Sequence, residues 1–596
     1  MRRLAALAAA AAMAWQSAAA QDYEQRRRRL IEKMARVEDA KLHYAGIAAR
    51  LWLREGVPAA ERRLRELLEG DISGDMFWMF PMTAISYLDR GQFSNATREL
   101  IRKSWKKYYP FRGDTENHWL LYYTSMYLMA QRWPEMDGEG WFNGKSSSEN
   151  MEEARRWIES WVKLTTTKGQ GEYDCTHYIG VYLLPLSYLA AWAEDPRMKK
   201  QASMMIEWIS ADFAAESLEG IYTGAHARTD DRQVVEKWRG VSADFAWLLF
   251  GQGKETPPFG GYSLYYALAD GPNPPEILHS IARDRSRPYT HLEKKRTRNR
   301  WRFHGELHGQ VYKITYMTKD YAVGSDQGGV LQPVQQHSWD VTWREDDPEG
   351  KHNTLFSLHP YSGMVELEAY FTFSPDFGTE AVWRSKTTYD SPGKLLGGSP
   401  YERIAQSEDA VIALYDIPEG TRFPHINGFF SKDLAEIEED GSGWIFCRGG
   451  RTRIAYRPLA PYVWKPMEGG GRRLFSPYLK NGTVVQAASV DEFPTAEAFR
   501  KAVKALRLEF ALEPKPRVAF RTLRGKTLEF SYGETPRIDG KPLDYAAWPA
   551  FGGPFLHGKA GEPRLEMTYE DKRRVLDFRT LTVTEERTER VPQRAR

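Results

Sequence analysis

Cysteine is scarce in this sequence: Cys175 and Cys447 are the only two among 596 residues. This scarcity excludes a disulfide scaffold and a cysteine-rich metal site, and it leaves either one bridge between the two or two buried thiols. A strong excess of one charge is also missing, because the formal net charge is only +3. A near-neutral chain of this kind argues against a dedicated nucleic-acid binder.

Several motifs of well-known chemistries are absent as well. The sequence contains no Gly-rich phosphate loop, no Gly-x-Ser-x-Gly elbow and no His-Glu-x-x-His motif. Nucleotide chemistry, serine hydrolysis and zinc-protease chemistry are therefore without support. No apolar run after the first twenty residues is long enough for a membrane-spanning helix, so we expect no transmembrane segment.

The first twenty residues have the organisation of a secretory signal peptide. Arg2 and Arg3 form a basic start, residues 4–15 form a short apolar run, and three alanines at 18–20 supply the small residues that a signal peptidase needs. The apolar run is too short for a permanent membrane anchor. The sequence therefore predicts an exported protein, periplasmic or extracellular, that is cleaved near Ala20.

Residues 21–285 are predicted to form one helical domain. Apolar residues recur there at helical spacing, with charged residues between them. Pro58 and the Asp195-Pro196 pair indicate helix starts, because proline is favoured in the first turn and aspartate just before it. Many helices of medium length with short connections indicate antiparallel helix pairs, either stacked or closed into a ring.

After residue 300 the pattern changes to alternation of polar and apolar residues. Segments such as 311–316, 528–532 and 575–578 alternate with period two, and Gly-rich turns separate such segments. We therefore expect residues 301–588 to form an antiparallel β-sandwich, with room for a smaller terminal sheet. The basic residues 286–300 are interpreted as a solvated linker and residues 589–596 as a disordered tail. The expected fold class is α+β with several domains.

Four clusters of polar and aromatic residues could carry chemistry. They combine His or Tyr with amide, Arg or acidic groups at predicted helix ends and loops, where a ring of helices would present a site. Alternation would place His337 and Trp339 of the last cluster on one face of a strand. His337 could also ligate a structural divalent metal with Asp340 and a third group. The clusters are Asp114–Trp119, Glu172–Tyr178 with Tyr182 following, Gly224–Asp231 and Gln335–Asp340.

Each cluster also has a purely structural interpretation. Asn117 could cap a helix, and His118 could be a histidine whose hydrogen bonds are satisfied in the core or at the surface. Tyr178 and Tyr182 are four residues apart, so they could form one stripe of a helix that faces the core. The presence of three such clusters in one domain favours the interpretation that they form a functional site.

The helical domain followed by a β domain, together with these motifs, resembles the toroid-type polysaccharide lyases, which are the heparinase II/III, alginate lyase and chondroitin AC lyase group. Asn117-His118 resembles the Asn-His pair of these enzymes, and residues 172–178 resemble the segment that carries their catalytic tyrosine. Residues 336–340 resemble the His-containing strand that their β domain offers to the cleft. The resemblance implies an N-terminal (α/α) toroid, an incomplete helical barrel, followed by the β-sandwich.

The resemblance also implies cleavage of a glycosidic bond next to a uronic acid by β-elimination. Asn117 and Arg228 would neutralise the uronate carboxylate, and His118 or Tyr178 would take the C5 proton. Tyr178 would protonate the leaving oxygen, with Tyr173 as the alternative catalytic tyrosine. The expected partner is an anionic polysaccharide, and no cofactor is expected to be required. The residues expected to bind substrate are Trp119, Tyr173, His177, Tyr182, His226, His337 and Trp339.

Two other functions fit the same sequence. One is a glycoside hydrolase on a helical toroid, which needs two carboxylates that flank the scissile bond. The other is a non-catalytic glycan-binding protein that keeps the fold without the chemistry. The motifs specify neither the polymer nor the oligomeric state. The acids that could serve a hydrolase are Asp114, Glu116, Asp174, Asp230 and Asp231.

Overall fold

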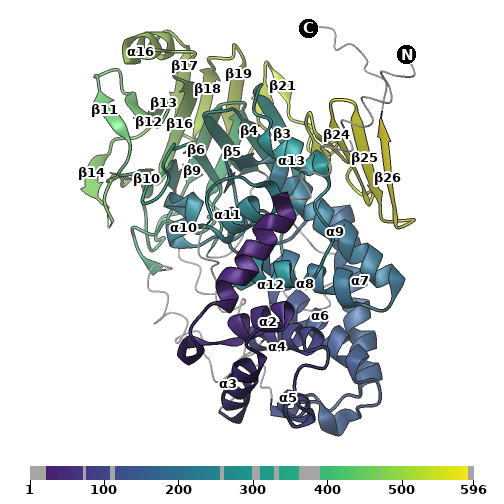
Figure 1. Cartoon of the computed structure of the whole chain (residues 1–596). Coiled ribbons are helices and arrows are strands. Elements are labelled where there is room, and N and C mark those ends of the chain that lie inside the picture. Colours follow the sequence, from purple (N-terminus) through teal and green to yellow (C-terminus); the bar gives the residue numbers. More distant parts are fainter. Residues whose placement is uncertain are drawn as a thin grey trace, which may run out of the picture.

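The computed structural model describes residues 22–70, 76–107, 115–255, 261–298, 309–327, 335–361, 390–467 and 469–587. Helices form the first half of the chain and antiparallel strands the second, so the predicted α+β class is confirmed (Figure 1). The predicted leader, the predicted tail and Asp114 lie outside the described residues.

The helical half begins with a helix over residues 22–35. The helices that follow pack against one another along the chain, as in the pairs α6 with α7 and α8 with α9. The helices are α2 (Tyr44–Leu53), α3 (Val57–Glu69), α4 (Met76–Leu88), α5 (Asn95–Lys107), α6 (Glu116–Arg132), α7 (Ser147–Lys168), α8 (Ile179–Trp192), α9 (Pro196–Ala215), α10 (Asp231–Val235), α11 (Val241–Phe245), α12 (Tyr262–Leu268) and α13 (Glu276–Arg283), with α16 (Ala496–Lys504) in the second half.

The helix starts follow local chemistry. Pro58 lies in the first turn of α3, and the side chain of Asp195 accepts a hydrogen bond from the backbone N–H of Arg197 at the start of α9. Ser146 and Glu149 form a reciprocal capping box at the start of α7. The two helix starts predicted from the sequence are therefore confirmed.

The described strands of the second half form two large antiparallel sheets and two smaller ones. The nine-stranded sheet has the order β14 (Val463–Pro466), β15 (Arg472–Ser476), β10 (Ile426–Phe430), β7 (Thr354–Leu358), β6 (Trp339–Trp343), β5 (Tyr321–Gln327), β4 (Gln310–Met317), β3 (Tyr289–Arg296) and β22 (Phe551–Gly552). The six-stranded sheet has the order β11 (Ala435–Glu439), β12 (Ile445–Gly449), β13 (Thr452–Pro458), β16 (Lys480–Ser489), β9 (Ala410–Asp416) and β8 (Glu402–Ser407). The five-stranded sheet has the order β17 (Leu508–Ala511), β18 (Arg517–Arg521), β19 (Thr527–Ser531), β20 (Arg537–Ile538) and β21 (Lys541–Pro542). The four-stranded sheet has the order β23 (Leu556–His557), β24 (Arg564–Tyr569), β25 (Lys572–Asp577) and β26 (Thr582–Arg587). A two-stranded ribbon, β1 (Ser217–Leu218) and β2 (Ile221–Tyr222), follows α9.

The two large sheets share one apolar core. Val341 and Phe356 of the nine-stranded sheet belong to the same buried cluster as Ile454 and Val485 of the six-stranded sheet. Inward residues of alternating strands pack in this way because one face of each sheet is apolar. The other face of the six-stranded sheet packs against the five-stranded sheet and α16, with Phe520 among its buried residues.

The last sheet returns to the helical half. Phe551, Leu565 and Leu576 belong to the same buried core as the helices. Arg574 of β25 donates two hydrogen bonds, each 2.8 Å long, to the carboxylate of Glu207 on α9. In Figure 1 the β24–β26 sheet lies beside α9. The chain therefore closes its first core with its last described strands.

The interpretation of residues 286–300 as a solvated linker is wrong for most of that segment. Residues 289–296 form β3, which pairs with β4 along its whole length in the nine-stranded sheet. Lys295 and Arg296 are buried, and both make ion pairs with buried carboxylates. The positive charges are therefore matched inside the protein instead of being solvated.

Cys175 and Cys447 are both buried and free, so the alternative of two thiols holds and a bridge between them does not. Burial raises the pKa of Cys175 to about 12, which keeps its thiol protonated. Among the helices that the structure describes, none combines the length and the apolar character needed to cross a membrane.

Candidate functional site

Arg228 lies at the centre of the polar contacts that join three of the predicted clusters. Its Nη1 donates to Glu172 Oε1 at 2.6 Å, and its Nη2 donates to the Tyr178 hydroxyl at 2.9 Å. Its Nε and Nη2 donate to Gln335 Oε1 at 2.9 and 2.6 Å. The guanidinium carbon also lies 4.2 Å from the centre of the Tyr178 ring, within the range of a cation–π contact. One buried cation thus binds residues of both halves.

Glu172 lies in the loop between α7 and α8 and is fully buried. Its Oε2 accepts three hydrogen bonds, from the Asn117 backbone N–H at 3.0 Å, from Asn117 Nδ2 at 2.5 Å and from the Tyr182 hydroxyl at 2.9 Å. Burial alone would raise the pKa of Glu172, but the charges of Arg228 and Arg298 and the bond from Asn117 lower it to about 2. Glu172 is therefore an anion throughout the neutral range.

Asn117 and His118 lie in the first turn of α6. Among the described residues, the Thr115 side chain makes no hydrogen bond that caps this helix. Glu172 caps it instead, because its carboxylate accepts a hydrogen bond from the Asn117 backbone N–H. Asn117 is therefore held by a cap and is not itself the cap. His118 is buried, and its ring meets that of Phe77 edge-on at 5.3 Å.

Tyr178 directly precedes α8, and its side chain is only half-buried. Its backbone N–H donates to Cys175 Sγ at 3.2 Å, which fixes the turn that leads into the helix. The ring of His177 meets the Tyr178 ring edge-on at 5.0 Å and the Tyr262 ring at 5.9 Å. Tyr178 and His177 therefore keep partial exposure, while Glu172 and Arg228 behind Tyr178 are buried.

The segment that precedes β6 runs alongside the segment that contains Arg228. The backbone N–H groups of His226 and His337 each donate to the carbonyl of the other residue at 2.9 Å. The Thr229 N–H donates to the Gln335 carbonyl at 2.9 Å as well. This antiparallel pairing brings Gln335, in the β half, onto Arg228.

The imidazoles of His226 and His337 belong to a buried polar network. His226 Nδ1 lies 2.5 Å from the Asp174 carbonyl and Nε2 lies 3.0 Å from Lys237 Nζ. His337 Nε2 lies 2.9 Å from Asp340 Oδ2. Burial lowers the pKa of both histidines, so both are neutral at pH 7.

Lys237 supplies the positive charge at the place where the sequence suggested a divalent metal. Its ammonium makes an ion pair with Asp340, and both side chains are fully buried. His337 and Asp340 already bond to each other. The described residues that could surround a metal ion lie elsewhere, at Asp212, His291 and Glu293 with neighbouring carboxylates.

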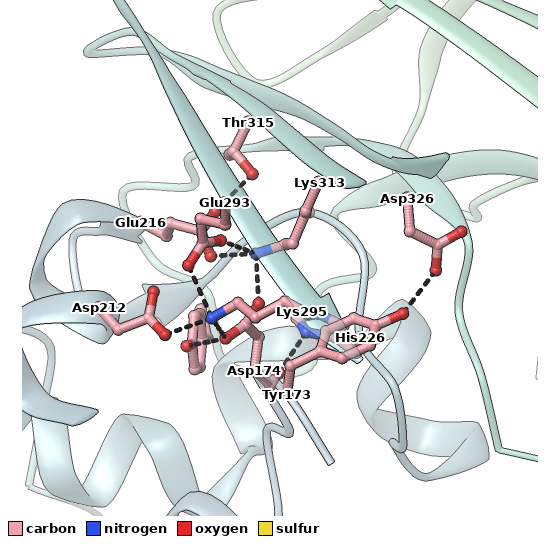
Figure 2. Close-up of polar contacts among 12 residues, drawn as sticks. Tyr173, Asp174, Asp212, Glu216, His226, Glu293, Lys295, Lys313, Thr315 and Asp326 are labelled. Carbon is pink, nitrogen blue, oxygen red and sulfur yellow. Dashed lines mark hydrogen bonds and ion pairs between the residues drawn. The ribbon is translucent and has the colours of Figure 1, made fainter. Parts of the chain in front are cut away.

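Those carboxylates form a buried charge network with two lysines where the halves meet (Figure 2). Lys313 of β4 makes ion pairs with Asp174 Oδ2 at 2.6 Å, with Glu293 Oε2 at 3.0 Å and with Glu216, just after α9. Burial alone would lower the pKa of Lys313, but these three carboxylates raise it. The lysine therefore stays charged inside the protein.

Lys295 of β3 is the second cation of this network. It makes ion pairs with Asp174 Oδ1 at 3.0 Å, with Glu293 Oε1 at 2.7 Å and with Asp212 of α9. Figure 2 shows both ammonium groups between the carboxylates. Asp174 therefore lies in a structural network that ties the 172–178 loop to β3 and β4.

Tyr173 is fully buried. Its hydroxyl donates to Asp326 Oδ2 at 2.9 Å (Figure 2). Gln336 Nε2 donates to the same oxygen at 2.7 Å. Burial raises the pKa of Asp326 to about 8 in spite of these two bonds. The folded protein therefore holds a proton on Asp326 at pH 7.

This proton makes stability depend on pH. Between about pH 3.9, where an unfolded aspartate loses its proton, and about 8, stability falls as pH rises, by about 1.4 kcal/mol per pH unit. Asp326→Asn keeps an oxygen that can accept both bonds and removes the proton. Between about pH 5 and pH 7, we expect the unfolding free energy of this variant to fall less steeply with pH than that of the wild-type protein. The difference in slope should be about 1.4 kcal/mol per pH unit.

The control for this measurement is Asp346→Asn, because the Asp346 side chain is 93% exposed. That variant should keep the wild-type dependence of unfolding free energy on pH. An Asp326→Asn variant with the wild-type slope would show that Asp326 is already ionised in the folded protein.

Several predicted substrate-binding residues are in the core and do not offer a surface for a sugar. Trp119 is fully buried against Trp157, and Trp339 is buried between the two large sheets. Tyr182 stacks on Trp161 at 5.7 Å while its hydroxyl binds Glu172. A role of Trp119, Tyr173, Tyr182, His226, His337 and Trp339 in direct sugar contact is therefore not supported in this conformation. Asn117 and His118 are buried as well, whereas His177 retains the exposure that such contact requires.

The sequence predicted the segments of the site. It gave no indication of the role of Glu172, the central anion, or of Gln335, which binds Arg228 from the β half. Glu172 and Gln335 were inside predicted clusters without a role. No pattern in the sequence indicates that Arg228 binds both, since the three residues come from distant segments. For the charge network a signal did exist: His291, Glu293 and Lys295 alternate with period two, which predicts one polar face of a strand.

A comparison with models of known protein families gave no match, and a comparison with curated proteins gave none either.

Proposed function

We propose that this protein is an exported polysaccharide lyase that cleaves a glycosidic bond next to a uronic acid by β-elimination. The observation that carries the proposal is the half-buried Tyr178, whose hydroxyl accepts a hydrogen bond from the buried Arg228, which shares Glu172 with Asn117. The proposal includes the finer architecture, an (α/α) toroid for the helices and a β-sandwich for the two large sheets. The core shared by these sheets supports the second assignment.

The reaction needs a base, an acid and stabilisation of negative charge. The C5 proton of the uronate goes to His118 or to ionised Tyr178, a double bond forms between C4 and C5, and the C4–O bond breaks. Tyr178 then gives a proton to the leaving oxygen. An arginine that donates to a phenol oxygen stabilises its negative charge, so Arg228 is suited to support Tyr178 in both steps.

The contacts of Arg228 support a different role from the one expected for it. Its Nη1 is bound to Glu172, its Nε to Gln335 and its Nη2 to Gln335 and Tyr178. A guanidinium held in this way acts on the tyrosine oxygen and not on the uronate carboxylate. Asn117, at the N-terminus of α6, is fully buried and its Nδ2 is bound to Glu172. Once polymer binding uncovers it, the Asn117 oxygen would hold the uronate carboxyl group neutral by accepting a hydrogen bond from its protonated form.

The candidate acids of a glycoside hydrolase are less well placed. Glu116 makes two hydrogen bonds, each 2.7 Å long, with Arg296, and both residues are fully buried. Asp174 belongs to the lysine network. Asp230 accepts a hydrogen bond from the Arg232 N–H and thereby caps α10. Carboxylates engaged in this way do not form the pair, one acid and one base or nucleophile, that hydrolysis needs.

The test is to incubate the purified protein with alginate, glucuronan, hyaluronan, chondroitin and heparan sulfate and to follow ultraviolet absorbance. β-Elimination creates a conjugated unsaturated uronate, so one of these polymers should give rising absorbance together with new reducing ends. New reducing ends without the absorbance would indicate hydrolysis. Binding without either signal would identify a glycan-binding protein.

A further inference from the structure

We propose that Glu172 is the positioning residue of this site: it sets the orientation of the Asn117 amide and of the Arg228 guanidinium, both buried, and through Arg228 that of the half-buried Tyr178. The inference rests on the proposed lyase function, and it assigns a task to a residue that would not itself touch substrate. Glu172 has no exposed surface, which excludes direct contact with a polymer in this conformation.

Glu172 fixes the orientation of the Asn117 amide. A carboxylate only accepts hydrogen bonds, so the amide group at 2.5 Å from Glu172 Oε2 must be the nitrogen. The Asn117 oxygen is then directed away from Glu172, and it has no hydrogen-bond partner among the described residues. Glu172 therefore decides which end of the amide is left for a ligand.

Glu172 and Gln335 together hold the Arg228 guanidinium in one orientation. Glu172 Oε1 holds Nη1 from the helical half, and Gln335 holds Nε and Nη2 from the β half. With both sides fixed, Nη2 is aimed at the Tyr178 hydroxyl at 2.9 Å and the guanidinium lies over the ring. Planar guanidinium groups gain this kind of geometric precision from paired contacts.

Glu172 also balances the buried positive charge of Arg228. The carboxylate of Glu172 compensates the charge of Arg228, and the two side chains are 0% and 5% exposed. Without this anion, the buried arginine would leave an uncompensated charge beside Tyr178, which is costly and changes the ionisation of its neighbours. Glu172 thus controls both the geometry and the electrostatics of the tyrosine.

The test compares Glu172→Gln with wild-type protein on the polymer that is cleaved. The shape is kept, the charge is lost, and the new amide can turn its NH₂ toward Arg228 or toward Asn117. We expect kcat to fall about 100-fold while KM changes less than about 3-fold, since orientation of the reacting groups is lost and the binding surface is not.

The pH profile gives a readout that mere destabilisation would not move. Whether His118 or Tyr178 is the base, a negative neighbour stabilises its protonated form. Loss of that charge should move the rising limb of kcat toward lower pH by roughly one unit. Glu172→Asp keeps the charge but shortens the reach, so it should lower kcat with the limb at the wild-type pH.

Glu207→Gln is the control, because Glu207 also receives two hydrogen bonds from an arginine, Arg574, but binds it at the C-terminal sheet. This control should keep wild-type kcat and the wild-type pH profile. If Glu172→Gln is folded and keeps kcat within about 3-fold, or if its rising limb stays in place, the positioning role is wrong. If the wild-type protein cleaves none of the polymers, the proposed function fails and this inference fails with it.

Discussion

Tyr178→Phe should lower kcat/KM for polymer cleavage by about 10³-fold, the loss typical of a removed acid–base group. The phenylalanine ring can still lie against the guanidinium of Arg228, which stays bound to Glu172 and Gln335. Stability should therefore change by only about 1 kcal/mol, the contribution of one hydrogen bond. The measurement is the initial rate of unsaturated-product formation at several polymer concentrations.

Tyr87→Phe provides the matched control. Tyr87 is also half-buried, stacks on Trp192 at 5.0 Å and donates one hydrogen bond of 2.8 Å to the Leu128 carbonyl, within the helices α4 and α6. Its loss should leave the rate unchanged. Undiminished cleavage by Tyr178→Phe would overturn the catalytic assignment of Tyr178.

Lys313→Met should destabilise the folded protein by about 3–5 kcal/mol, because breaking a buried ion pair from one side leaves uncompensated charge. Asp174, Glu216 and Glu293 would all lose the same ammonium group. The carboxylates raise the pKa of Lys313 above its ordinary value, so its contribution is fully present at neutral pH and is lost only at strongly alkaline pH. Urea unfolding at about pH 7, followed by tryptophan fluorescence, measures the effect.

Lys319→Met is the corresponding surface variant. Lys319 pairs with Asp491, and the two side chains are 57% and 47% exposed. Exposed pairs of this kind contribute about 0–1 kcal/mol, so this substitution should change stability little. A Lys313→Met variant that is equally mild would mean that the carboxylates neutralise themselves by taking up protons.

The order of helices and strands could be predicted from the sequence because it depends on local periodicity. Pro58 and Asp195 indicated helix starts, and the alternation at 311–316 indicated the strand that became β4. These signals arise from contacts within one element, so they do not depend on the rest of the fold.

The roles of charged residues could not be predicted in the same way. The basic segment around Lys295 was interpreted as solvated because charged runs usually are, yet its partners Asp174 and Asp212 come from distant parts of the chain. Arg228 was expected to face the substrate because nothing in the sequence shows that Glu172 and Gln335 bind it. Burial decides whether a polar group binds substrate or protein, and burial is a property of the whole fold.

The return of the last sheet to the helices has a consequence for how the chain matures. During synthesis the helical half is made first, but Leu565 and Leu576, which complete its core, come almost three hundred residues later. An apolar face of the helices therefore stays uncovered until the C-terminal segment packs against it. A truncation before β24 would remove this cover, so the helical half is not a separable module even though the sequence divides at residue 285.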